Sequence, residues 1–117
     1  MSDLNCKYLQ LLLIELDDLH GDLDMLVDAY KKEKADNKIS NYVFMENLAL
    51  LHNEIIGIRL FHDVVDNLKT QKFASLEELI CRVKSEFNKK MHENGIAAAL
   101  NKFIDKKLDK VEKFIRE

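Results

Sequence analysis

Proline is absent from the 117 residues of this sequence, and glycine occurs only three times. Both residues interrupt helices, so their scarcity leaves room for long ones. Stretches that alternate apolar and polar residues, as half-buried strands do, are absent too, while strong helix formers dominate. The sequence therefore predicts an all-α fold, and its length suits one domain over residues 1–117.

Cysteine is scarce as well: Cys6 and Cys81 are far apart and belong to no paired motif. We interpret them as small buried hydrophobes in a reducing compartment, not as a disulfide framework. No apolar run reaches the ~18 residues of a membrane span. The first apolar stretch is interrupted by Glu15 and Asp17, which is not typical of a signal peptide. We therefore expect a soluble cytoplasmic protein with no membrane partner.

Basic residues do not outnumber acidic ones, and the formal net charge is −3. This argues against nucleic acid as a partner. The charge is unevenly spread: residues 1–68 include 6 basic and 13 acidic side chains, whereas residues 69–117 include 12 basic and 8 acidic ones. Either acidic helices dock on basic ones within one molecule, or a basic face receives an acidic partner. We favour the first interpretation.

Two long helices are predicted in the first half of the chain. The first runs to about Lys34 and has an apolar seam with alternating steps of three and four residues. The seam consists of Leu9, Leu12, Leu16, Leu19, Leu23, Leu26 and Tyr30. Gly21 lies within this helix, where a close approach of another backbone would account for it. A short polar link from Ala35 to Ile39 follows.

The second long helix, Ser40 to Leu68, is apolar on several sides. One line of residues runs through Phe44, Leu48, Leu51, Ile55, Ile58 and Val65, with His62 in the gap before Val65. Another line runs through Met45, Ala49, Ile56 and Leu60. Because a helix of this kind is surrounded by other helices or by a second chain, we expect it to organise the whole fold.

Two shorter helices are predicted in the second half. Ser75 and Glu78 form a capping box at the start of the third helix, and Gly95 closes that helix in a left-handed conformation. The fourth helix runs from about Ala97 to Arg116. Short links between four helices predict an up-down-up-down antiparallel bundle with two long and two shorter helices. The alternative is three helices, with the last two fused and kinked at Gly95.

One buried cluster should join all four helices. The residues expected in it are Leu16, Leu19, Leu51, Ile55, Ile58, Val83, Phe87, Leu100 and Ile104.

Histidine and aspartate side chains share helical faces at two places. Asp17, His20, Asp24 and Asp28 lie roughly in line on the first helix, and His62 precedes Asp66 by four residues. This spacing aims two side chains at one point, as metal sites in helical bundles require. A dinuclear carboxylate site would need a Glu-x-x-His motif on two helices, and the chain offers only one Asp17-x-x-His20. We therefore expect no metal and no cofactor, with His20, Asp24, His62 and Asp66 as the candidate ligands if a metal is bound.

No stretch has a specific catalytic signature, because the sequence shows neither a triad-like arrangement nor a glycine-rich phosphate loop. We therefore interpret the chain as a small helical module that binds another protein, including its own copy, rather than as an enzyme. The alternative class is a metal-dependent enzyme or a metal-binding bundle that uses the histidine and aspartate pairs.

Helix lengths predict where a partner would bind. The first two helices should be about 42–45 Å long and the last two about 30 Å. The shorter pair therefore covers only the lower two-thirds of the long pair and leaves the other end bare. That end is rich in aromatic and methionine side chains, which are typical of interfaces. The expected interface residues are Leu26, Tyr30, Tyr42, Phe44, Met45 and Leu48.

Overall fold

A computed structural model describes residues 3–95 and 98–117. Within these residues the fold is all-helical, as predicted, with two long and two shorter helices. The helices are α1 (Asp3–Ala35), α2 (Asn41–Leu68), α3 (Leu76–Asn94) and α4 (Ala98–Arg116). The predicted start of the fourth helix, Ala97, lies outside the described residues. The three-helix alternative is wrong, because α3 ends at a separate cap before α4 begins.

Local chemistry explains where the helices begin and end. Ser40 Oγ accepts a hydrogen bond from the Val43 N–H at 3.2 Å and caps α2. Ser75 Oγ accepts from the Glu78 N–H at 3.1 Å, and Glu78 Oε2 accepts from the Ala74 N–H at 3.0 Å. The predicted capping box is therefore present, although its return bond goes to the residue before the cap.

The end of α3 also follows the prediction. Gly95 has φ 60° and ψ 38°, and its N–H donates to the Met91 carbonyl. Side chains other than glycine rarely adopt this left-handed conformation, so Gly95 stops the helix where the sequence indicates.

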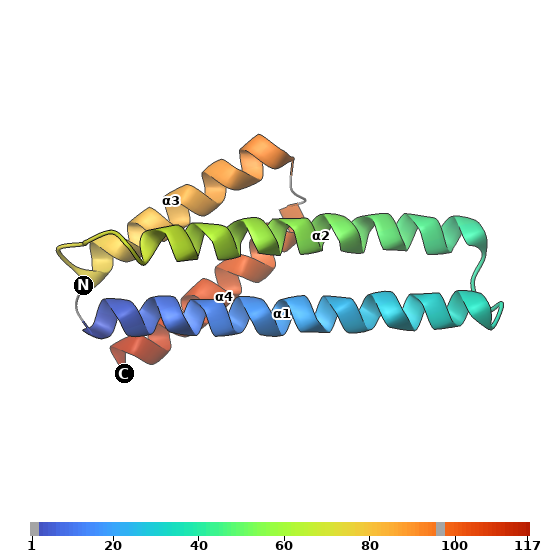
Figure 1. The fold of residues 1–117 in the computed structure, drawn as a ribbon, viewed down its shortest axis with the longest axis horizontal. Helices are drawn as coiled ribbons and strands as arrows, with labels where there is room; N and C mark the ends of the chain where they lie inside the picture. The colour runs from blue at the N-terminus through green and yellow to red at the C-terminus, as the bar shows by residue number, and fades with distance from the viewer. Residues whose placement is uncertain (1–2, 96–97) are drawn as a thin grey trace.

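The helices are arranged as a long hairpin with two shorter helices at one end. Figure 1 shows α1 and α2 side by side and running in opposite directions. α3 packs on α2 and α4 packs on α1, and both lie obliquely beside the end that holds the N-terminus of α1. The other end of the hairpin projects beyond them, which gives the molecule principal extents of 55 × 28 × 21 Å. We call this projecting part, residues 25–50, the bare end.

The core lies between the hairpin and the two shorter helices. All of the expected core residues belong to it, except that Leu19 is only partly buried against it. Phe61 of α2 and Phe87 of α3 are in contact, with ring centroids 4.4 Å apart. Leu26 continues the α1 seam but is 45% exposed. In Figure 1 the shorter helices stop before this part of the hairpin.

Charge joins α1 to α4 within the molecule, as the favoured interpretation predicts. Glu15 lies between two lysines of α4, with Lys107 Nζ at 3.0 Å and Lys110 Nζ at 2.7 Å from its carboxylate oxygens. The hydrogen bond from Lys110 and the neighbouring Lys107 hold the pKa of Glu15 below its usual value. Arg116 at the end of α4 pairs with Glu77 at the start of α3, at 2.9 Å.

Two sequence interpretations are wrong. Cys6 and Cys81 are exposed rather than buried, because each sits on the outer side of its helix beside a buried neighbour. A Cβ on Gly21 would have no atom within 4 Å, so no second backbone approaches there.

Among the described residues, no helix has the length and apolarity needed to cross a membrane.

Candidate functional site

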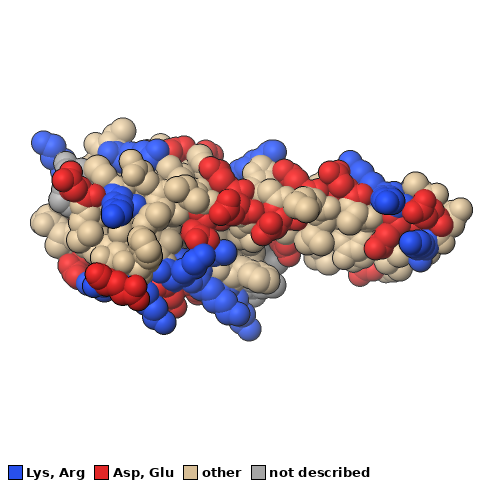
Figure 2. Space-filling view, turned by 90° about the horizontal axis from the view of Figure 1, so that it is seen from below, with Lys and Arg blue, Asp and Glu red and all other residues tan. Residues whose placement is uncertain are grey.

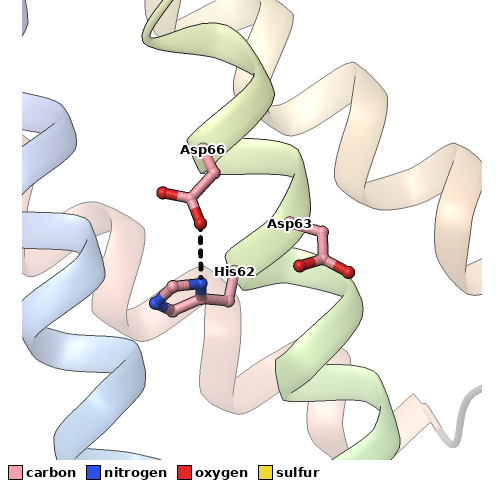
Figure 3. Close-up of side chains that lie close together, drawn as sticks. All are labelled: His62, Asp63 and Asp66. Atoms are coloured by element: carbon pink, nitrogen blue, oxygen red, sulfur yellow. Dashed lines mark ion pairs between the residues drawn. The ribbon is translucent and has the colours of Figure 1, made fainter.

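Titratable side chains from two helices come together where α1 and α2 face each other. His62 occupies an apolar-seam position of α2, which turns its imidazole toward α1. Its Nε2 lies 3.4 Å from Asp17 Oδ1 of α1, and its Nδ1 lies 3.2 Å from Asp66 Oδ2 on the next turn of α2 (Figure 3). The ring is about one-third exposed, whereas both carboxylates reach into solvent. His62 therefore contacts α1 through Nε2 and its own helix, α2, through Nδ1.

Asp66 and Asp63 have different surroundings. The second carboxylate oxygen of Asp66 pairs with Lys69 Nζ at 3.4 Å, so this carboxylate is held from two sides. Donor atoms of His62, Asp63 and Asp66 all lie within 4.8 Å of one another. Figure 3 shows, however, that the Asp63 carboxylate points away from the His62–Asp66 pair. Asp63 directly follows His62 and therefore lies on a different face from it, although Asp63 and Asp66, three residues apart, are neighbours on the surface of α2.

The α1 side of the site contributes a second histidine. His20 follows Asp17 by one helical turn, and its Nε2 lies 3.6 Å from Asp24 Oδ2. The side chain of His20 is only 27% exposed. A shallow hollow between the two helices is lined by Asp17, His20, Ile58, Arg59, His62 and Asp63. The structure thus brings both candidate histidines, from two helices, to one hollow.

The four candidate ligands do not contribute equally. His20 and His62 line the hollow, whereas Asp24 and Asp66 each accompany one histidine on its own helix. The sequence did not single out Arg59, and it gave no sign that Asp17 pairs with His62. The Asp17-x-x-His20 spacing was visible, but its partner on α2 depends on the register between the helices.

The remaining histidines and the buried tyrosine Tyr8 do not contribute to this hollow. His52 and His92 are exposed and do not line this hollow. The hydroxyl of Tyr8 is buried without a hydrogen-bond partner among residues 3–95 and 98–117. Burial raises the pKa of Tyr8, and the nearby carboxylates of Glu112 and Asp109 raise it further, so this phenol stays protonated. It is sealed in the core and cannot reach a substrate.

The predicted interface residues are spread around the bare end. Tyr42, Met45 and Leu26 are well exposed, at 76%, 61% and 45%. Tyr30 and Leu48 are partly buried. Phe44 is buried inside the hairpin with Lys34 Nζ 4.8 Å from its ring centroid, so its placement on the surface is corrected. Further exposed apolar side chains, which the interface prediction does not include, are those of Met25, Val43 and Leu50.

No protein-family model, curated protein or solved structure matches this chain.

Proposed function

We propose that this protein is a protein-binding module, an up-down-up-down antiparallel bundle that associates with its own copy through the bare end. We further propose that it acts in the cytoplasm, where its exposed cysteines Cys6 and Cys81 would stay reduced. One observation carries the proposal of self-association: an exposed apolar stripe on α2. Its residues are Tyr42, Met45 and Ala49 of the bare end and Ile56, which lies just beyond it on α2.

The spacing of the stripe is that of a helix-packing seam. Its steps of three, four and seven residues place the four side chains on one side of α2, over about 21 Å of helix. That side is turned away from the ring of Phe61, which packs on α3. All four residues are exposed although three of them are large and apolar. Aromatic and methionine side chains gathered in this way are typical of protein interfaces.

Charge favours a second copy as the partner. Residues 15–28 of α1 include six acidic side chains and no basic one, and Figure 2 shows acidic groups gathered along the middle of the molecule. Residues 29–40, at the turn of the hairpin, include four lysines and two acidic side chains. In a two-fold antiparallel pairing of the stripes, the lysine-rich turn of one copy lies level along the helix axis with the acidic middle of the other, so that long-range attraction favours this pairing. Hydrophobic contact and charge then support the same arrangement.

Light scattering coupled to size-exclusion chromatography tests this proposal. Wild type should show a mass near twice the 13.7 kDa of the chain at high concentration. Tyr42→Glu combined with Met45→Glu should give a monomer, because two charges would be buried in the seam. The control is Ile14→Glu combined with Phe103→Glu, which changes two comparably exposed apolar residues away from the bare end. This control should remain dimeric.

Circular dichroism must show that both double variants keep the helical content of wild type, so that a change of mass is not a change of fold. Added salt should weaken the dimer, since it screens the lysine–carboxylate attraction. A wild type that stays monomeric at every concentration, or a dimer that both double variants disturb equally, contradicts the proposal.

A further inference from the structure

Two apolar hollows lie side by side where the end of α4 packs against the start of α1. The larger has a volume of about 440 Å³, and its apolar lining comes from Leu11 of α1 and from Val111 and Phe114 of α4. The smaller has a volume of about 320 Å³, and its apolar lining comes from Leu4, Phe114 and Ile115. Both volumes are typical of sites that bind small molecules.

Phe114 belongs to both hollows, so they form one continuous trough along α1. The trough extends from Leu4 to Leu11, which is about 10 Å at 1.5 Å per residue. The side chain of Phe114 is 59% exposed, and that of Leu4 is 44% exposed. Water in the trough therefore meets a large apolar surface, and a ligand that displaced this water would bury that surface.

A cluster of charges closes the trough on the side of the larger hollow. Glu15 of α1 lies 3.0 Å from Lys107 Nζ and 2.7 Å from Lys110 Nζ of α4. Phe103, the other exposed phenylalanine of α4, lies beyond this cluster and lines neither hollow. A partner helix would need an apolar groove that continues over several turns, and the cluster interrupts it. The trough therefore fits a small molecule better than a helix.

Lysines determine which charge this molecule should have. Lys7 lines the smaller hollow and Lys113 lines the larger one. Within residues 3–95 and 98–117, neither lysine forms an ion pair. Lys110 also lines the larger hollow, where it pairs with Glu15. Glu117 lines both hollows and opposes an anion, but the two unpaired lysines leave a positive balance at the edge of the trough.

From these contacts we propose that the trough binds a medium-chain fatty carboxylate, a single-chain amphiphile with an anionic head group. The acyl chain lies against Leu4, Leu11 and Phe114, and the carboxylate pairs with Lys113. A pair with one exposed lysine is weak, so most of the affinity comes from burial of the acyl chain. The proposal does not depend on the dimer, because the trough lies at the opposite end of the molecule from the bare end (Figure 1).

Isothermal titration with sodium dodecanoate, kept below its critical micelle concentration, tests the site. Wild type should bind one dodecanoate per chain. Butanoate has the same head group and a short chain, and it should bind at least roughly tenfold more weakly because it buries less apolar surface. Dodecyltrimethylammonium has the same chain and a positive charge, and it should also bind more weakly than dodecanoate.

Variants of α4 locate the binding site. Phe114→Ser should weaken dodecanoate binding about tenfold, whereas Phe103→Ser, the matched control, should bind as wild type does. Lys113→Gln should weaken binding about threefold, and Lys113→Arg should restore it. Lys106→Gln is the control for the lost charge, because Lys106 is exposed and lines neither hollow. Glu117→Gln should tighten binding, since it removes the opposing charge.

The Tyr42→Glu, Met45→Glu double variant should bind dodecanoate as wild type does, which separates the trough from the bare end. Circular dichroism of each variant checks that the fold persists. Vesicles that contain phosphatidylglycerol test an anionic membrane as the alternative ligand. The proposal is overturned by a wild type that binds no dodecanoate, by binding to vesicles alone, by equal losses in Phe114→Ser and Phe103→Ser, or by dodecyltrimethylammonium binding as tightly as dodecanoate.

Discussion

Two adjacent isoleucines of α2 offer a direct test of how the hairpin is packed. Ile55 belongs to the core and is 8% exposed, whereas Ile56 lies on the apolar stripe and is 51% exposed. Ile55→Ala and Ile56→Ala remove the same atoms from the same helix. Differences in helix propensity therefore cancel between them, and any remaining difference in stability reports burial.

The expected magnitudes follow from the two environments. Truncating a buried isoleucine to alanine costs about 2–5 kcal/mol, through lost transfer energy and the cavity that remains. Alanine has the better helix propensity, which offsets up to about 0.5 kcal/mol of this loss. The free energy of unfolding should therefore fall by about 2–4 kcal/mol in Ile55→Ala. A half-exposed isoleucine loses only about 1 kcal/mol, which the propensity gain partly offsets. Ile56→Ala should therefore stay within about 1 kcal/mol of wild type.

Urea unfolding followed by circular dichroism measures both values, and thermal melts provide a second measure. In a domain of this size, about 1 kcal/mol corresponds to roughly 4 °C, so the melting temperature of Ile55→Ala should fall by about 8–16 °C. The experiment should be run at low protein concentration, where a dimer contributes little to stability. Equal losses in the two variants would refute the assignment of Ile55 to the core and Ile56 to the surface.

Two further predictions concern α1 and the end of α3. Gly21→Ala should raise the free energy of unfolding by about 0.5–1 kcal/mol, because alanine is the better helix former and its Cβ meets no atom within 4 Å. Gly95→Ala, the matched substitution at φ 60°, should lower it by about 1 kcal/mol, and chemical denaturation of both variants measures the two signs. The pKa of Glu15 is lowered by Lys110 and Lys107, so its stabilising effect is complete above the usual value of 4.5 and is lost as the pH falls through the lowered pKa. Glu15→Gln should therefore flatten the acid side of a plot of melting temperature against pH, while Glu46→Gln, at an exposed position, should not; a slope unchanged in Glu15→Gln would contradict this.

The helices and their ends could be predicted because their signals are local. The capping box at Ser75 and Glu78 and the left-handed Gly95 depend on residues a few positions apart, and the structure has both. The core could be predicted for a similar reason. Helical periodicity alone places the apolar residues on one face, and that face is the one that packs against a neighbouring helix.

The limits of the core and the pairs in the hollow depend on how helices are placed against each other. Leu23 and Leu26 continue the same seam, yet Leu23 is buried and Leu26 is half exposed. Their spacing does not say how far along α1 the oblique α4 extends. The pairing of Asp17 with His62 depends likewise on the register between α1 and α2. A periodic apolar seam does not fix this register, because one helix can shift along the other by a full turn and still bury the same face. The exposed position of Cys6 shows that an apolar residue beside a seam need not be covered.

Each of the two shorter helices packs on a different helix of the hairpin, and this has a consequence for partial unfolding. α3 rests on α2 and α4 rests on α1, so each docks on the hairpin largely by itself. α4 can therefore detach while α3 stays in place, and its amide protons should exchange with solvent before those at the centre of α2. The hairpin would then survive as a separate cooperative unit with one side of α1 open to water.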